Sequence, residues 1–105
     1  MNTLYLNETI VEPIHPGEIL KEDFLEPLGI SQNELARALR VAPGRINEIV
    51  NRKRGISAET AMRLGRYFGM DPAFWVNLQT HYDLELARDT VGAAVEREVL
   101  PRAVA

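Results

Sequence analysis

Basic side chains and carboxamides gather in one short stretch, Arg40 to Ser57, of a chain that is acidic overall. The stretch RVAPGRINEIVNRKRGIS holds five of the twelve basic residues and only one of the fifteen acidic ones. Guanidinium, ammonium and carboxamide groups donate hydrogen bonds, and they suit phosphate oxygens and the acceptor edges of bases. The chemistry that this stretch could carry is therefore the binding of a polyanion.

The flanking segments would repel a polyanion. Residues 1–30 carry a net charge of −5, residues 31–66 of +5 and residues 67–105 of −3, which sum to the −3 of the whole chain. A polyanion is drawn to the middle third alone. No nucleophile–base arrangement or glycine-rich phosphate loop appears, and His15 and His81 stand apart from other metal ligands. We therefore expect no enzyme activity, metal, cofactor or small-molecule substrate.

Composition places the chain among single-domain globular proteins. Its 105 residues are 46% hydrophobic, enough for one core. No apolar run approaches the length of a membrane span, and no secretion signal is visible at the start. The absence of cysteine excludes disulfides and zinc–thiolate sites. These features predict a cytoplasmic protein.

Prolines, glycines and capping residues predict an all-α fold of five helices. Pro16 opens the first helix, Ser31 with Glu34 forms a capping box for the second, and Ser57 caps the fourth. The expected helices cover about residues 16–26, 31–39, 43–51, 57–68 and 72–88. We expect a leader arm at 1–14, a helical domain at 15–88 and a weakly helical tail at 89–105. Leu4, Leu6 and Ile10 could make a short strand in the leader.

The second and third expected helices form a helix-turn-helix. They are joined by a turn of three or four residues, the geometry that lets the second helix lie in the major groove of a duplex. Their apolar side chains predict the packing: Leu35 and Leu39 face inward from one helix, and Ile46 and Ile49 from the other. The outward residues of the second helix are then Ala42, Pro43, Gly44, Asn47, Glu48 and Asn51, with Arg45 on the flank.

The segment SQNELARALRVAPGRINEIVNRKRGISAETAMRLGRYFG resembles the helix-turn-helix of phage repressors and their relatives, the XRE or Cro/CI group. With IHPGEILKEDFLEPLGIS before it and MDPAFWVNLQTHYDLELA after it, residues 14–87 are similar to HigA-type antitoxins, the plasmid-maintenance antidote family. The sequence departs from the repressor pattern at Arg40, where a glycine is usual in the turn. A positive φ is costly for arginine but is not prohibited.

The resemblance implies roles for individual residues. Gln32 and Asn33 would hold phosphate oxygens at a helix N-terminus, which favours anions. Asn47 and Asn51 would contact bases or phosphates, and Arg45 a guanine edge or the backbone. The remaining expected contacts are a close approach at Ala42, Pro43 and Gly44, a cytosine contact by Glu48, and phosphate contacts from Arg52, Lys53 and Arg54.

Each role has a purely structural alternative. Arg52 to Arg54 would otherwise form a solvated loop, and Arg45 would pair with Glu48 or Glu34 at the surface. Asn51 would only end its helix, and Glu48 would only repel phosphates. The aromatic residues Phe74, Trp75 and Tyr82 recur at helical spacing, which is typical of a core rather than of a ligand-binding cage.

One recognition helix contacts few bases, so we expect a homodimer that reads a palindrome of double-stranded operator DNA. Its expected interface comprises Phe74, Trp75, Leu78, Tyr82 and Leu86, with Leu84 and Val91 as further apolar material. The resemblance also implies a small basic toxin partner, a HigB ribonuclease of the RelE type, and repression of the operon that encodes both proteins. Two alternatives stay open: a repressor-like regulator without a toxin, and a protein-interaction module that has lost DNA binding.

Overall fold

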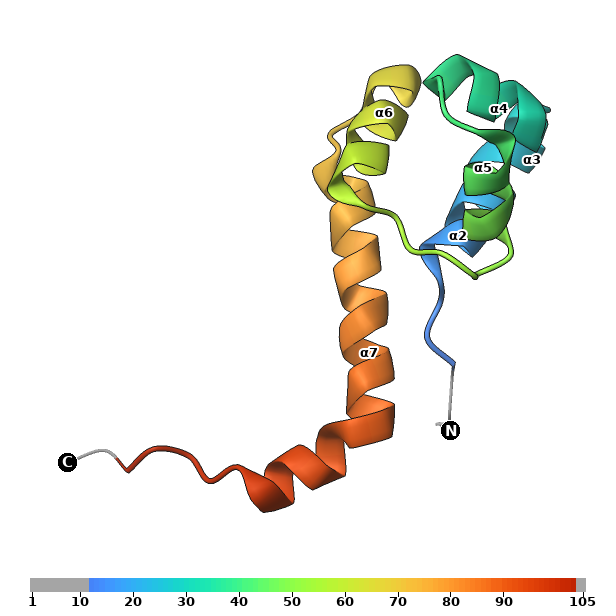
Figure 1. Cartoon of the computed structure of the whole chain (residues 1–105). Helices are drawn as coiled ribbons and strands as arrows, with labels where there is room; N and C mark the ends of the chain where they lie inside the picture. The colour runs from blue at the N-terminus through green and yellow to red at the C-terminus, as the bar shows by residue number, and fades with distance from the viewer. Residues whose placement is uncertain (1–11, 104–105) are drawn as a thin grey trace, which may run out of the picture.

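The computed structural model describes residues 12–103, which form helices and no strand (Figure 1). The elements are α2 (Pro16–Ile19), η1 (Leu20–Leu25), α3 (Glu26–Leu28), α4 (Gln32–Leu39), α5 (Pro43–Val50), α6 (Ala58–Phe68) and α7 (Ala73–Glu98). Because α2, η1 and α3 follow one another without a break, the described residues form five helical rods, and the predicted all-α fold is confirmed. The strand suggested at Leu4, Leu6 and Ile10 lies outside the described residues.

The first rod contains a π-helical segment, η1, just before a proline. We expected this helix to end near Glu26, but Pro27 lies inside α3, and the rod ends at Gly29 with a left-handed φ of 66°. A proline ring in a regular α-helix clashes with the carbonyl four residues earlier, here that of Asp23. The wider π turn, in which the amide of Glu26 donates to the carbonyl of Lys21, relieves that crowding.

The caps predicted for the next helices are present. Ser31 Oγ accepts a hydrogen bond from the Glu34 amide at 3.0 Å, and Glu34 Oε1 accepts one from the Ser31 amide at 3.2 Å. Ser57 Oγ accepts from the Thr60 amide at the start of α6, which ends at Gly69 with φ 68°. These local contacts satisfy backbone groups that a helix end leaves unpaired.

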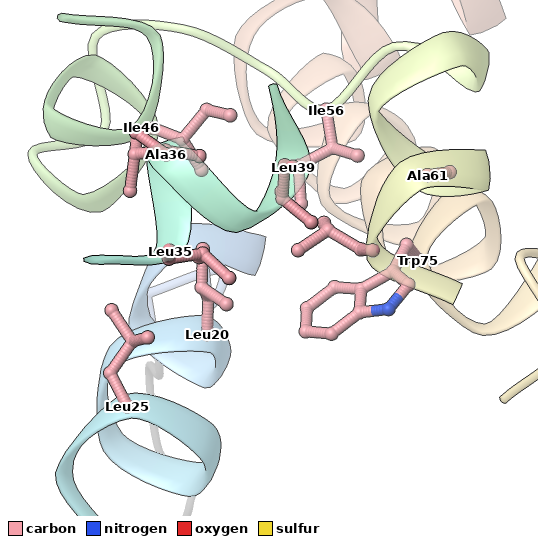
Figure 2. Close-up of a cluster of buried hydrophobic side chains, with 11 residues drawn as sticks. Leu20, Leu25, Leu35, Ala36, Leu39, Ile46, Ile56, Ala61 and Trp75 are labelled. Atoms are coloured by element: carbon pink, nitrogen blue, oxygen red, sulfur yellow. The ribbon is translucent and has the colours of Figure 1, made fainter. Parts of the chain in front are cut away.

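The core lies between the first rod, the helix-turn-helix, α6 and the start of α7 (Figure 2). Leu20, Leu35 and Ile46 are completely buried, and Trp75 contributes the largest fully buried side chain. The ring of Phe24 packs against Trp75 at a centroid distance of 4.9 Å. The core interpretation of Trp75 is thus confirmed. Its predicted place in a dimer interface is wrong, because none of its surface is exposed in the monomer.

The last helix extends further than predicted. It runs through Gly92 to Glu98, whereas we expected it to stop near Arg88 and leave a weakly helical tail. A glycine inside a helix costs only about 1 kcal/mol relative to alanine, too little to interrupt this one. The helix ends at Val99, two residues before Pro101. Its C-terminal part projects away from the other helices and changes direction near the end (Figure 1). None of the helices in residues 12–103 is both long and apolar enough to cross a membrane.

The turn between α4 and α5 holds Arg40 in the left-handed region, with φ 61° and ψ 43°. We predict that Arg40→Gly raises the free energy of unfolding by about 0.5–1 kcal/mol, because glycine adopts this conformation without the steric cost that arginine meets. The measurement is urea unfolding followed by circular dichroism. Arg37→Gly is the matched control, since it removes the same charge from the interior of α4.

The control should lower stability by about 1 kcal/mol, because glycine is a poor helix former. Equal losses from both substitutions would contradict the assignment of a strained backbone at Arg40.

Candidate nucleic-acid interface

The second helix of the motif, α5, buries its isoleucine side chains and exposes its polar face. Ile46 and Ile49 are fully buried beneath it, packed with Leu35 and Ala36 of α4. Of the outward residues predicted from the sequence, Ala42, Pro43, Gly44, Asn47 and Asn51 are exposed in the structure, whereas Glu48 and the flanking Arg45 are partly buried. The pattern of buried and exposed residues in α5 is therefore the one that a helix-turn-helix requires.

A side-chain hydrogen bond joins the two motif helices on this outer face. Asn47 Nδ2 donates to Gln32 Oε1 at 3.3 Å. Gln32 is the first residue of α4, where free backbone amides favour an anion, and Asn33 beside it is exposed. The contact leaves the carbonyl oxygen of Asn47 and the amino group of Gln32 available to a ligand. The structure thus brings three predicted contact residues to one surface.

Arg45 lies between α5 and the start of α6. Its Nη1 is 3.4 Å from Glu59 Oε1 and 3.5 Å from Thr60 Oγ1. The alternative pairing with Glu48 or Glu34 is therefore wrong, because α6 brings Glu59 closer. Hydrogen bonds from Arg63 to Glu59, together with the charges of Arg63 and Arg45, lower the pKa of Glu59.

The basic loop after α5 is partly paired with carboxylates. Arg52 Nη1 lies 3.0 Å from Glu18 Oε2, and Arg54 Nε lies 2.8 Å from Glu48 Oε1. Pairs as exposed as these contribute less than about 1 kcal/mol, so a phosphate can replace the carboxylate. Lys53 is exposed and has no carboxylate within 4 Å among the described residues. Asn51 occupies the C-cap of α5, as its structural alternative required.

The structure shows a second basic surface, which was not identified from the sequence. It is an open groove of about 670 Å³ between the end of α4 and the side of α6, lined by Ala38, Leu39, Arg40, Met62, Arg63, Arg66 and Tyr67. Arg63 Nη1 donates to the Leu39 carbonyl at 2.9 Å, which fixes one guanidinium at its edge. The charge count included these arginines, but only helix packing shows that Arg40 lies near Arg66.

The two histidines occupy different surroundings. His15 is buried at the start of α2, and His81 is exposed on α7. Within residues 12–103, no three His, Cys, Asp or Glu side chains cluster so that they could hold a metal ion.

The residues expected to form a dimer interface are divided by the structure. Phe74 and Leu86 are exposed, whereas Leu78 and Tyr82 are partly buried within the monomer. The distal half of α7 also exposes Leu84 at 50%, Val91 at 48% and Val95 at 50%. Their spacing of seven and then four residues places them on one face of the helix. We call these three residues the distal stripe.

The profile of the helix-turn-helix family matches residues 21–75. Virulence-associated protein I of Dichelobacter nodosus is 61% identical over 70% of this chain and 68% of its own length. Antitoxin HigA-1 of Vibrio cholerae is 35% identical over 75% of this chain and 74% of its own. The solved structure of Pseudomonas aeruginosa antitoxin HigA with the higBA promoter superposes with a TM-score of 0.85 at 49% identity, covering 88% of this chain and all of that one.

Proposed function

The chain belongs to the HigA-type antitoxin family of helix-turn-helix proteins, and from this membership we propose that it binds operator DNA as a homodimer, represses its own operon and neutralises a RelE-type toxin. The observation that carries the DNA-binding part is the outer face of α5, which presents Asn47, joined to Gln32, beside the loop of Arg52, Lys53 and Arg54. The similar HigA from Pseudomonas aeruginosa was solved with promoter DNA, which supports the same role here.

In this proposal some residues contact the phosphate backbone and others contact base edges. Gln32, Asn33 and the basic loop contact phosphates, which position the protein without reading sequence. Asn47 and Arg45 read base edges, Arg45 after exchanging Glu59 for the duplex. Glu48 holds Arg54 at 2.8 Å and adds a negative charge near the groove, so it tunes selectivity at some cost in overall affinity.

We predict that the log–log dependence of operator affinity on salt has a slope near about −7, as expected for about eight phosphate contacts per dimer. The double variant Lys53→Gln, Arg54→Gln removes four positive charges per dimer and should flatten the slope to about −4 on every sequence. Fluorescence anisotropy with the promoter of its own gene and with an unrelated duplex measures both. The matched control is Arg97→Gln, Arg102→Gln, which changes the charge equally at the C-terminal end, off the face of the distal stripe, and should leave the slope unchanged.

Asn47→Ala tests base reading separately. The variant should lose far more affinity for the operator than for the unrelated duplex. The difference between the two losses should be about 1–3 kcal/mol for each base pair that Asn47 reads. An equal loss on both duplexes would show that Asn47 contacts only the backbone.

The dimer is proposed through α7. From Leu84 onward α7 contributes no buried residue within residues 12–103, and a helix without packing is marginal in water. A second copy laid against it would cover the distal stripe of Leu84, Val91 and Val95. Phe74 and Leu86 are also exposed on α7, but Leu86 lies about 160° around the helix from Leu84 and so faces away from the distal stripe. A two-fold pair also supplies the second recognition helix that a palindromic site requires.

We predict that Val91→Glu converts the dimer to a monomer of 11.8 kDa, because it places a charge in the middle of the distal stripe. Sedimentation velocity at micromolar concentration measures the change. Ala93→Glu is the control, since residue 93 lies about 160° around the helix from residue 91. A wild-type protein that sediments as a monomer would refute the dimer.

The toxin part rests on family membership and on charge. Residues 1–30 and 67–105 together carry −8, which complements a small basic ribonuclease. The described part of the acidic surface includes the face of the first rod with Glu22, Asp23 and Glu26, all exposed. Such complementarity raises the rate of association more than it raises the affinity.

We predict that co-expression with the adjacent reading frame rescues growth and that the two proteins co-purify. The Lys53→Gln, Arg54→Gln variant should still rescue growth when it is expressed from an unrelated promoter, because those residues serve DNA binding and not neutralisation. If the adjacent reading frame encodes a toxic protein that this chain neither neutralises nor binds, only the toxin part of the proposal is contradicted.

A second function, a regulator without a toxin, has one observation in its favour. The relative at 61% identity is named for virulence and not for a toxin. This alternative keeps every DNA-binding prediction above and differs only in the co-expression result.

A further inference from the structure

The tetrapeptide His15-Pro16-Gly17-Glu18 has no part in the proposed contacts with DNA, yet three of its four residues are buried. It lies where the start of α2 meets the end of the recognition helix and the middle of α7. We infer that this tetrapeptide is a joint that positions the C-terminal end of α5, and that protonation of His15 opens the joint and weakens operator binding. The inference rests on the proposed function in that operator affinity is one of its two readouts.

His15 forms the cap of α2 through a nitrogen that must be unprotonated. Its Nδ1 accepts a hydrogen bond from the Gly17 amide at 2.9 Å, and the residue is only 3% exposed. A neutral imidazole can accept at one nitrogen and donate at the other, whereas an imidazolium can only donate. Protonation at Nδ1 would therefore remove the cap and leave the Gly17 amide buried without a partner.

Gly17 is the point of contact with the recognition helix. A Cβ at this position would overlap the carbonyl oxygen of Ile49, so the two backbones touch as closely as glycine permits. The same carbonyl accepts the Arg52 amide at 3.1 Å, at the start of the basic loop. Glu18 adds a second link through its ion pair with Arg52 at 3.0 Å. A displacement of the backbone at the start of α2 would therefore also move the end of α5 and the loop that follows it.

The third wall of the joint is α7. The rings of His15 and Tyr82 meet edge to face, with centroids 4.8 Å apart and planes at 70°. The charged groups around His15 are Glu18 on α2, Arg52 after α5 and Asp83 on α7. Burial and the Arg52 charge lower the pKa of His15 from its ordinary value of 6.5, and they outweigh Glu18 and Asp83, which raise it.

The direction of the pH effect follows from this lowered pKa. Above pH 6.5 the ring is neutral in the closed joint and in the opened one, so the joint is fully stable. As the pH falls below 6.5, the opened form takes up a proton before the closed form does, and the balance moves toward opening. The loss continues until the pH passes the lower pKa of the closed joint. Acid should therefore loosen the end of α5 and the loop that carries Arg52, Lys53 and Arg54.

The first test is operator affinity between pH 7.5 and 5.5, measured by fluorescence anisotropy with the promoter duplex of its own gene. The wild type should lose more affinity than His15→Asn, by at most about tenfold, because asparagine also caps helices but does not titrate in this range. His81→Asn is the matched control, since His81 is exposed on α7 and its replacement should preserve the wild-type profile. An unchanged pH profile in His15→Asn would overturn the inference.

The second test uses the free wild-type protein and needs neither DNA nor a variant. In nuclear magnetic resonance titrations, the His15 ring should protonate below pH 6.5 with Nδ1 as the unprotonated nitrogen above it. The amides of Gly17 and Arg52 should shift with the same midpoint. A His15 ring that titrates at or above 6.5, or amides that do not follow it, would refute the joint. If the protein binds no duplex at any pH, the proposed function fails, while this titration still decides the inference.

Discussion

The arrangement of this molecule depends on the burial of one face of α5. Ile46 and Ile49 must be covered on the inside so that the polar side of the same short helix can stand outside. An eight-residue helix is not stable alone, so its position is a property of what packs beneath it. Leu35 and Ala36 cover it from α4, and the backbone at Gly17 covers its last turn from α2. The outer face is thus placed by contacts that no ligand touches.

The two arginines of the basic loop are each paired with a carboxylate, whereas Lys53 has none within 4 Å among the described residues. Glu18 and Glu48 each hold one arginine of the loop, and Glu59 holds Arg45 at the other end of α5. Exposed pairs of this kind are weak, and salt or phosphate can displace them. They orient the guanidinium groups and limit the attraction to any passing polyanion. A protein that must choose one sequence among many benefits from such moderation, because phosphate attraction alone does not discriminate.

The last helix has two different halves. Its first turns carry Trp75 into the core and place Tyr82 against His15, so they complete the domain. Its distal half carries Leu84, Val91 and Val95 on an exposed face and contributes no buried residue. A domain with this much uncovered apolar surface is suited to a partner, and the partner proposed here is a second copy. One helix would then link the interior of a subunit to the assembly that a palindrome requires.

The sequence by itself determined the features that arise within a few residues. The capping box of Ser31 and Glu34, the end of the fourth helix at residue 68 and most of the outward face of α5 were predicted because local hydrogen bonds and helical periodicity decide them. Tertiary structure alone decided which distant residues meet. It gave Arg45 the partner Glu59, put Trp75 wholly inside, and set Gly17 against Ile49, since such contacts depend on how whole helices pack and not on neighbouring residues.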